Sequence, residues 1–368
     1  MSALFTHIRR FDWLLMGAVL LLIAIGLTSL FSLSGIRATH FFERQLVWAG
    51  VGIILLIGSS MVDFRIFRTQ TAAVIALYAL AILLLAAVLI VSPRVRGIRA
   101  WLQIGGVALQ PVELAKLSLA VLLAKFFSKR HIEIYRIRHL IVSGLYLVLP
   151  MLLVMLQPDP GSAVVLIAIW VAAVLFSGMR LRHFFYLLAV GIATASIAWF
   201  FVLLPYQKAR ITSFLDPYRD PQGAGYQMIQ SMIAVGSGRV WGKGLGYGSQ
   251  SHLHFLPEPH ADFIFAAYTE EWGFVGSTLL LGLIGAVIWR IIHIGSRARD
   301  NFSRIYTIGF AAFIFSQSFI HIGMNMGLLP ITGITLPFVS YGGSSLVTLM
   351  IGVGIVQNIH INARREVE

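Results

Sequence analysis

Long apolar runs recur along this 368-residue chain and constrain its fold more than any other feature. A run of about 20 apolar residues can cross a bilayer as an α-helix. The runs are continuous rather than alternating in polarity, which favours a helical bundle over a β-barrel, because backbone groups in lipid must be bonded within each segment. We therefore expect an all-α polytopic membrane protein of about ten spans, near residues 12–33, 46–62, 71–91, 111–127, 139–156, 161–178, 183–204, 262–289, 304–327 and 339–360.

The composition supports this assignment. Only 12% of the residues are charged, whereas a soluble domain carries about 25%. The net charge of +13 could suggest nucleic acid in a soluble protein, but here the basic residues lie in short loops between apolar runs. We interpret them as topology signals and contacts to membrane lipids, and expect no nucleic-acid partner. The absence of cysteine excludes disulfides and thiolate chemistry.

The distribution of basic residues predicts the topology. An even number of spans places both termini on one side, and most lysines and arginines lie in loops on that side. The positive-inside rule then makes both termini cytoplasmic and places the long loop 205–261 outside. We expect a single integral membrane domain over residues 1–368. The uncharged segment 327–337 contains two prolines and could either re-enter the bundle or form a short turn.

Residues 236–273 join a glycine-rich run to the point where an apolar run restarts. The glycines allow tight bends or the close approach of a ligand, although an ordinary surface loop can have the same composition. Lys243 within this run could contact a phosphate. Asp262, at the restart, could act as a catalytic carboxylate or simply cap the next helix.

A zinc site is a third possibility in this stretch. His252, His254, His260 and Asp262 could supply ligands, but their spacing matches no strong motif, so we assign no metal site.

Charged residues also occur inside predicted spans. Glu113 and Lys116 are three residues apart and share a helix face. Such groups usually pair with each other or line a polar cavity, so both a structural ion pair and a ligand contact are open. Glu270 and Glu271 lie about two helical turns beyond Asp262, and we interpret them as hydrogen-bonded groups inside the bundle.

Two residues near the outer side have both structural and functional interpretations. Asp159, between Pro158 and Pro160, is typical of a turn. Trp101 could anchor the chain at the membrane interface or stack on a sugar ring.

Several motifs together resemble the SEDS family (shape, elongation, division and sporulation), which contains the RodA and FtsW proteins of bacterial cell-wall synthesis. The resemblance covers nearly the whole chain. It rests on the QPxELAK pattern ending at Lys116, QPDxG at 157–161, DPxxDPxGAGYQxIQS at 216–231, GKGLGxGSQS, FLPExHxDFIF and GITLPFVSYGGSS. Residues 248–251 and Phe255 are more similar to RodA. The chain departs from the usual pattern at Val112, Pro160, Ser162, where threonine is usual, and Ala261.

The resemblance implies a peptidoglycan glycosyltransferase that polymerises lipid II at the outer face of the bacterial cytoplasmic membrane. It implies Asp262 as the catalytic general base and a class B penicillin-binding protein as the transpeptidase partner. It also implies substrate binding by Trp101, Glu113, Lys116, Arg210, Lys243, Ser249, Gln250, Glu258 and His260.

The implied reaction is an attack by a sugar hydroxyl of one lipid II on the anomeric carbon of another. A carboxylate would take the hydroxyl proton, and a single displacement would invert the anomeric carbon. Lys116, Lys243, a nearby arginine or a divalent cation, Mg or Mn, could stabilise the leaving pyrophosphate. Two rival functions stay open for such a chain: a flippase for the same lipid, and a scaffold without activity.

Overall fold

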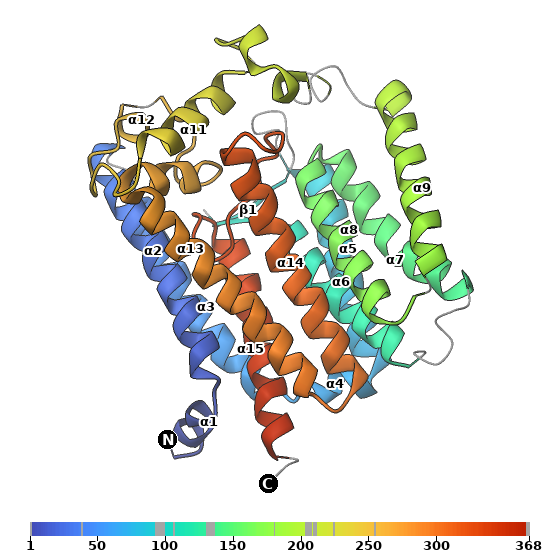
Figure 1. Ribbon diagram of the computed structural model, residues 1–368. Coiled ribbons are helices and arrows are strands. Elements are labelled where there is room, and N and C mark those ends of the chain that lie inside the picture. Colours follow the sequence, from blue (N-terminus) through green and yellow to red (C-terminus); the bar gives the residue numbers. More distant parts are fainter. Residues whose placement is uncertain are drawn as a thin grey trace.

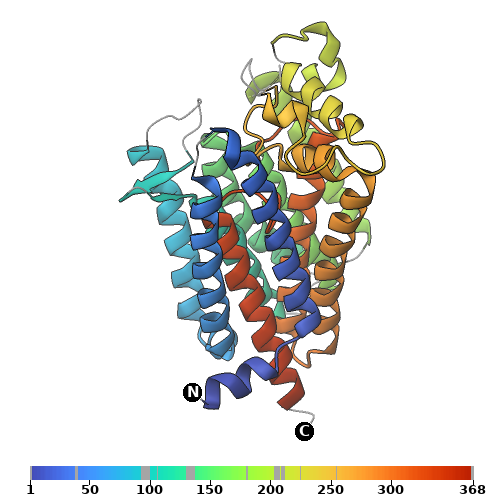
Figure 2. The ribbon, with the colours of Figure 1, turned by 90° about the vertical axis from the view of Figure 1, so that its left-hand side faces the viewer.

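A computed structural model of the chain describes residues 2–37, 40–92, 100–105, 107–129, 137–179, 181–202, 208, 212–223, 225–253 and 255–365. Long helices run side by side through the molecule, and α1 (Ser2–Arg9) lies across one end of them (Figures 1 and 2). The long helices are α2 (Trp13–Arg37), α3 (Phe41–Met61), α5 (Thr71–Val91), α6 (Pro111–Ser128), α7 (Ile137–Leu156), α8 (Pro160–Phe176), α9 (Leu181–Ile197), α13 (Ile264–Arg297), α14 (Asn301–Asn325) and α15 (Gly343–Arg365).

Short elements connect the long helices. They are α4 (Arg65–Thr69), β1 (Leu102–Ile104), β2 (Val107–Leu109), the π-helical turn η1 (Ala198–Val202), the 3-10 turn η2 (Pro217–Arg219), α11 (Tyr226–Ser237) and α12 (Ser249–His252). The antiparallel β1–β2 hairpin is the one sheet among the described residues.

The predicted polytopic helical fold is confirmed. Within the described ranges, eight helices are long and apolar enough to cross a membrane. The other two predicted spans correspond to α6, which carries Glu113, Lys116 and Lys125, and to α8, which is apolar but has 17 residues. The predicted span 262–289 is longer in the structure, because α13 continues to Arg297.

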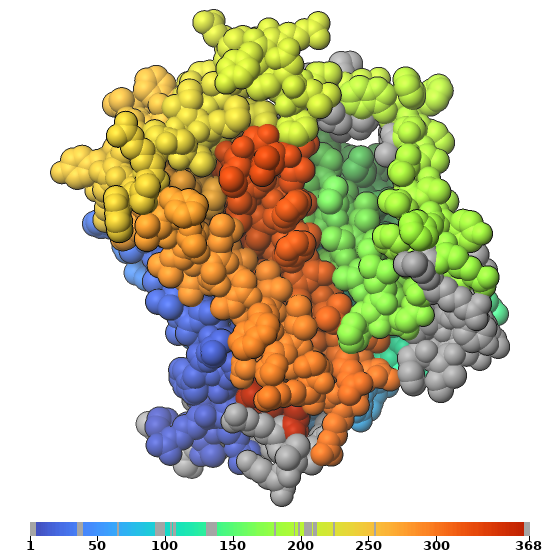
Figure 3. All heavy atoms as spheres, in the orientation of Figure 1, coloured from blue at the N-terminus to red at the C-terminus, as the bar shows by residue number. Residues whose placement is uncertain are grey.

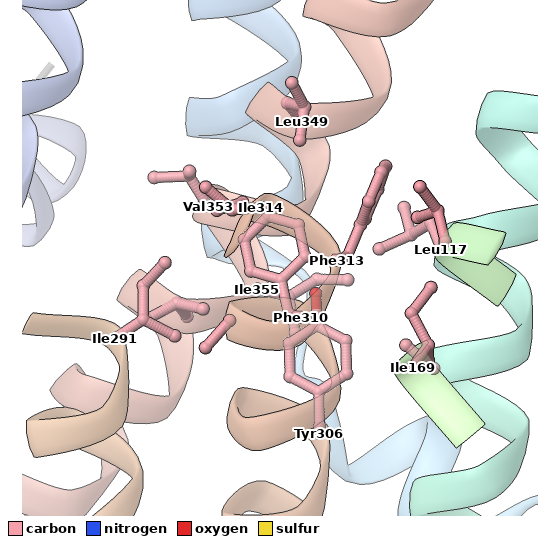
Figure 4. Close-up of a cluster of buried hydrophobic side chains, with 14 of the residues drawn as sticks. Leu117, Ile169, Ile291, Tyr306, Phe310, Phe313, Ile314, Leu349, Val353 and Ile355 are labelled. Carbon is pink, nitrogen blue, oxygen red and sulfur yellow. The ribbon is translucent and has the colours of Figure 1, made fainter. Parts of the chain in front are cut away.

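The centre of the bundle is formed by α14 and α15. Tyr306, Phe310 and Phe313 of α14 form a buried aromatic row, which packs against side chains of α6, α8, α13 and α15 (Figure 4). Lipid is as apolar as these side chains, so close packing rather than escape from water holds such helices together. Small residues make the packing possible: a Cβ atom at Gly352 would lie 2.3 Å from the Phe310 ring.

A network of ion pairs and hydrogen bonds joins three helices at the end where α1 lies. Arg290 of α13 donates from Nε to Oδ1 and Oδ2 of Asp12, at 2.9 and 2.8 Å. The backbone of Asp12 is bonded in both directions to the side chain of Gln357 on α15. The start of α2 is therefore fixed to α13 and α15. Both α1 and the end of α15 lie at this end of the bundle (Figures 1 and 2).

The predicted outer loop contains helices that its sequence did not reveal. α11 covers the end of the bundle away from the termini (Figure 1) and buries Met228, Ser231 and Ala234. The Ser231 hydroxyl donates to the Asn325 carbonyl at 2.9 Å, which ties α11 to the end of α14. By contrast, α9 forms the outer edge of the molecule (Figure 3).

The segment between α14 and α15 re-enters the bundle, which is the first of the two conformations considered above. Its residues Leu336, Phe338 and Val339 are buried. Its backbone is bonded by side chains of neighbouring helices: Gln317 donates to Thr335 O at 3.0 Å, and His321 Nδ1 lies 2.7 Å from Ile334 O. Irregular backbone is tolerated inside a membrane protein when it is paired in this way.

Candidate active site

A cavity of about 610 Å³ opens at the end of the bundle opposite the termini. Its wall comes from the start of α3, the β1–β2 hairpin, the turn before α13 and the re-entrant segment. The lining residues include Trp101, Glu113, Ser162, Glu258, His260, Asp262, Gly333, Ile334 and Thr335.

Several helices begin at this cavity. Glu43 lies in the first turn of α3, Gln110 directly precedes α6, and Ser162 lies in the first turn of α8. α13 and α15 also start at its edge. The N-terminus of a helix carries a partial positive charge and free N–H groups. These ends can attract a negatively charged ligand group, but Asp159 already caps α8, and Glu43 and Glu113 lie in the first turns of α3 and α6.

Asp262 lies in the turn that leads into α13 and is partly exposed. Two neighbouring elements hold the turn. Asn325 of α14 donates to the Asp262 carbonyl at 3.0 Å, and the Tyr341 amide donates to the His260 carbonyl at 2.9 Å. A Cβ atom at Gly333 would lie 3.6 Å from Oδ2 of Asp262, so the carboxylate lies next to the re-entrant segment.

The helix-cap interpretation of Asp262 concerns the turn that directly precedes α13. α13 begins at Ile264, and Phe263 occupies the cap position. Asp159 does act as a cap, since its side chain accepts the Ser162 amide at 3.0 Å and begins α8. The interpretation of Asp159 as a structural residue is therefore confirmed.

Glu258 and His260 stand beside Asp262 on the same wall. His260 Nε2 lies 3.3 Å from Glu258 Oε2, and its ring stacks on Phe41 with the centroids 3.9 Å apart. Glu258 has a φ of 49°, a left-handed conformation that is rare for a residue with a side chain. Such strain is retained where the surroundings enforce it, often at binding sites.

Glu113 and Lys116 form the ion pair that their spacing allowed, with 2.8 Å between Oε1 and Nζ. Lys116 is fully buried and also donates to Gln317 Oε1 at 3.2 Å. Gln317 in turn bonds to Thr335 of the cavity wall. Glu113 reaches the cavity itself, whereas Lys116 lies behind it.

Trp101 is placed on the cavity wall by the hairpin that follows it. Ser92 donates to the Trp101 carbonyl at 2.7 Å, and the Gln110 amide at the end of the hairpin donates to Ser344 of α15 at 3.0 Å. The ring is half-buried. It is available to a ligand in the cavity, as the stacking interpretation requires.

Lys243, Ser249 and Gln250 do not line this cavity but bind Glu270, which is fully buried. Oε1 of Glu270 accepts Lys243 Nζ at 2.7 Å, Ser249 Oγ at 3.2 Å and the Gln250 amide at 2.9 Å. Oε2 accepts the Ser251 amide at 3.2 Å. We call residues 238–252 with Glu270 and Glu271 the loop anchor.

Glu271 completes the loop anchor from the next position of α13. It accepts the Gly246 amide at 3.1 Å and the Ser32 hydroxyl, and its Oε1 lies 3.0 Å from His252 Nε2. The interpretation of Glu270 and Glu271 as hydrogen-bonded groups inside the protein is thus confirmed.

A break in α13 explains why the loop fits there. Gly273 has φ 65° and ψ −161°, which interrupts the helical hydrogen bonds. The freed groups bond to the loop: Phe274 N to Arg239 O, Val275 N to Val240 O, Lys243 N to Glu270 O and Gly244 N to Glu271 O. A Cβ atom at Gly242 would lie 2.1 Å from Glu271 O, so this approach requires glycine.

The structure therefore divides the predicted site residues into two groups. Asp262, Trp101, Glu113, Glu258 and His260 share the cavity, with Lys116 behind them. The other group, Lys243, Ser249 and Gln250, belongs to the loop anchor. Arg210 lies outside the described residues.

The possible zinc ligands are also separated. His252 binds Glu271, His260 lines the cavity, and His254 lies outside the described residues. In the described part of the chain, no three His, Cys, Asp or Glu side chains are grouped to hold a metal ion. Among the described candidates, His252 and His260 are therefore in different regions and do not fit one shared metal site.

Sequence reasoning missed part of the cavity wall. Ser162 was noted only as a departure from the family pattern. Residues 333–335 and 341–345 were not proposed to bind a ligand, although the GITLPFVSYGGSS motif covers them. The motif could have indicated this part of the cavity wall, but it contains no charged residue that would suggest a binding or catalytic site.

Comparison with known proteins gives consistent matches. Residues 12–365 match the family model described as "Cell cycle protein", named for FtsW, RodA and SpoVE. The chain is 38% identical over 358 residues to stage V sporulation protein E of Bacillus subtilis, covering 95% of this chain and 96% of that one. It is 37% identical to the Escherichia coli peptidoglycan glycosyltransferase MrdB, covering 88% and 86%.

Solved structures agree with these matches. One, described as "Structural coordination of polymerization and crosslinking by a peptidoglycan synthase complex", superposes with a TM-score of 0.80 and 34% identity over 96% of this chain and 98% of that one. The rod shape determining protein RodA of Thermus thermophilus gives a TM-score of 0.71 and 30% identity over 95% and 96%.

Proposed function

The chain belongs to the FtsW/RodA/SpoVE family of cell cycle proteins, and from this premise we propose that it is a peptidoglycan glycosyltransferase that polymerises lipid II. Relatives of this chain in several bacteria are named peptidoglycan glycosyltransferases. The observation that carries the proposal is the cavity, in which a partly exposed carboxylate, Asp262, lies beside Trp101, Glu258 and the ends of several helices.

In the proposed reaction Asp262 is the general base. A sugar hydroxyl of one lipid II gives its proton to the carboxylate while its oxygen attacks the anomeric carbon of a second lipid II. The bond from that carbon to the pyrophosphate breaks, so the anomeric configuration inverts. Such a base contributes about 10² to 10⁴ in rate.

The leaving pyrophosphate needs positive charge near it as the bond breaks. The helix ends at the cavity and Arg44 on its wall can supply it. Lys116 lies behind the wall and is paired with Glu113, which offsets its charge. A divalent cation would have to be held largely by the substrate's own oxygens, and no step here depends on one.

A transpeptidase partner fits this assignment. One structural relative is described as a peptidoglycan synthase complex that coordinates polymerisation with crosslinking. We propose that this chain likewise forms a complex with a class B penicillin-binding protein, surrounded by membrane lipids.

The proposed site requires a defined topology in the bacterial cytoplasmic membrane. We propose one integral membrane domain over residues 1–368, with both termini cytoplasmic and the cavity and loop 205–261 outside. The chain has no cysteine, so a single introduced cysteine is a clean probe. Tyr247→Cys, at a position 77% exposed, should react with an impermeant thiol reagent in spheroplasts, and a cysteine added after residue 368 should not. Labelling of the second variant with protection of the first would contradict this topology.

Purified protein in liposomes with lipid II tests the function. The proposal predicts glycan polymer. Translocation of lipid II without polymer would instead support a flippase, and neither activity, in a preparation that binds its partner, would support a scaffold. Either result would overturn the proposal.

A further inference from the structure

Two residues of the cavity wall each carry a buried polar atom that has no hydrogen-bond partner among the described residues. These atoms are Oε2 of Glu113 and Oγ of Ser162. Both residues line the cavity, and their exposed fractions are 2% and 1%. A buried polar atom without a partner is destabilising, so such atoms usually contact water or a ligand.

The unpartnered oxygen of Glu113 requires a hydrogen-bond donor. Its other carboxylate oxygen, Oε1, already accepts Lys116 Nζ at 2.8 Å. A carboxylate in an ion pair can only accept hydrogen bonds. An N–H or O–H group of a ligand would therefore supply the missing hydrogen bond to Oε2 of Glu113, whereas a phosphate or carboxylate would be repelled by it.

Ser162 differs from Ser118 and Ser143, two other buried serines in helices. Ser318 of α14 also has a hydroxyl without a partner in the described part of the chain, but it does not line the cavity. The hydroxyls of Ser118 and Ser143 each donate to the carbonyl three residues earlier, at 3.0 Å. Ser162 lies in the first turn of α8, where its amide is held by Asp159 and its hydroxyl has no such bond. This hydroxyl can therefore donate a hydrogen bond to a ligand.

The two residues lie on a preformed part of the wall. α6 and α8 pack against each other. The start of α8 also lies against the re-entrant segment, since a Cβ atom at Gly161 would be 2.8 Å from Ile334 Cγ2. An apolar methyl group of Ile334 thus lies next to the backbone that carries Ser162. A rigid site of this kind loses little conformational entropy when a ligand binds.

Resting on the proposed function, we propose that Glu113 and Ser162 form a subsite for an acetamido group of the sugar substrate. The amide N–H donates to Oε2 of Glu113, and the Ser162 hydroxyl donates to the amide oxygen. The methyl of the acetamido group lies against Ile334. A cation would not need the Ser162 donor, and a ring hydroxyl would leave the apolar part of the wall uncovered.

Equilibrium binding tests this subsite without relying on catalysis. All variants carry Asp262→Asn, so that bound lipid II is not consumed. The ligands are lipid II and analogues with hydrogen in place of the acetamido group on one or the other sugar. We expect Ser162→Ala to weaken lipid II binding about 3- to 10-fold. With one of the two analogues it should change binding less than about twofold, because the group that Ser162 recognises is missing.

Two controls separate this role from a structural one. Ser162→Thr keeps the hydroxyl and should bind lipid II as tightly as the Asp262→Asn protein does. Ser118→Ala, on α6 and outside the cavity wall, should leave the difference in affinity between lipid II and the analogues unchanged. An equal effect of Ser162→Ala on all ligands, or no effect on any, would overturn the subsite. If the effect of Ser162→Ala were instead lost with a lipid II analogue that lacks a ring hydroxyl, the assignment of the acetamido group would be overturned. If the expected binding differences are found, but the protein with the native Asp262 makes no polymer, the proposed glycosyltransferase function would be refuted and the subsite would be retained.

Discussion

Two polar regions at the same end of the molecule use their charges in opposite ways. In the loop anchor both carboxylate oxygens of Glu270 are bonded. Oε1 accepts hydrogen bonds from Lys243, Ser249 and the Gln250 amide, and Oε2 accepts the amides of Gln250 and Ser251. In the cavity, Oε2 of Glu113 has no partner in the described part of the chain. Since a saturated carboxylate has little capacity left for a ligand, the loop anchor is suited to hold structure and the cavity to bind substrate.

The glycines of the two regions show the same difference. Gly242 in the loop anchor and Gly333 in the cavity both have positive φ, at 81° and 76°. A Cβ atom at Gly242 would collide with Glu271 O at 2.1 Å, while one at Gly333 would make an ordinary contact of 3.6 Å with Asp262. The first glycine is needed for backbone packing, and the second keeps space open beside the carboxylate.

The largest effect on stability is expected from Lys243→Met. Removing one partner of a buried ion pair leaves the other charge uncompensated, and we expect a loss of about 3 kcal/mol in unfolding free energy. Unfolding of the purified protein in detergent measures it, with Arg239→Met, an exposed position on the same loop, as the control. Loss of lipid II binding at unchanged stability would return Lys243 to the substrate-binding role that the family resemblance implies.

Gly333→Ala should affect activity more than stability. A left-handed alanine costs about 1–2 kcal/mol, but the added methyl beside Asp262 should also displace the attacking sugar and reduce polymerisation on the order of 10²-fold. Gly105→Ala, at φ 58° with no atom within 4 Å of the new Cβ, is the matched control. It should lose similar stability and keep its activity; equal activity in the two variants would show that the reaction does not take place beside Gly333.

Ser249→Ala should have the smallest effect. It removes one neutral partner of Glu270, which still has Lys243 and two backbone amides. We expect a loss of about 1 kcal/mol and an unchanged KM for lipid II in the liposome assay. A raised KM in a protein of normal stability would place Ser249 in contact with the substrate.

The sequence predicted the helices well because each apolar run is also a span. It did not reveal α11, whose 12 residues form too short a helix to be a span. Within the site, Asp262, Glu113 and Trp101 could be assigned to one end of the bundle from motif positions alone. The partner of Lys243 could not be predicted, because a lysine among glycines looks the same whether it meets a phosphate or a glutamate 27 residues later. That choice depends on the break at Gly273, and an isolated glycine in an apolar helix gives no sign of one.

Polymer formation by the Asp262→Asn variant tests the central claim most directly. Asparagine has nearly the same shape and keeps the backbone bonds of the turn, including the one from Asn325, but it cannot take a proton. With purified protein in liposomes, and thermal unfolding measured on the same preparation, we predict unchanged stability and polymerisation reduced by about 10²-fold or more. Polymer at near the parent rate from the stably folded variant would contradict the assignment of Asp262 as the base.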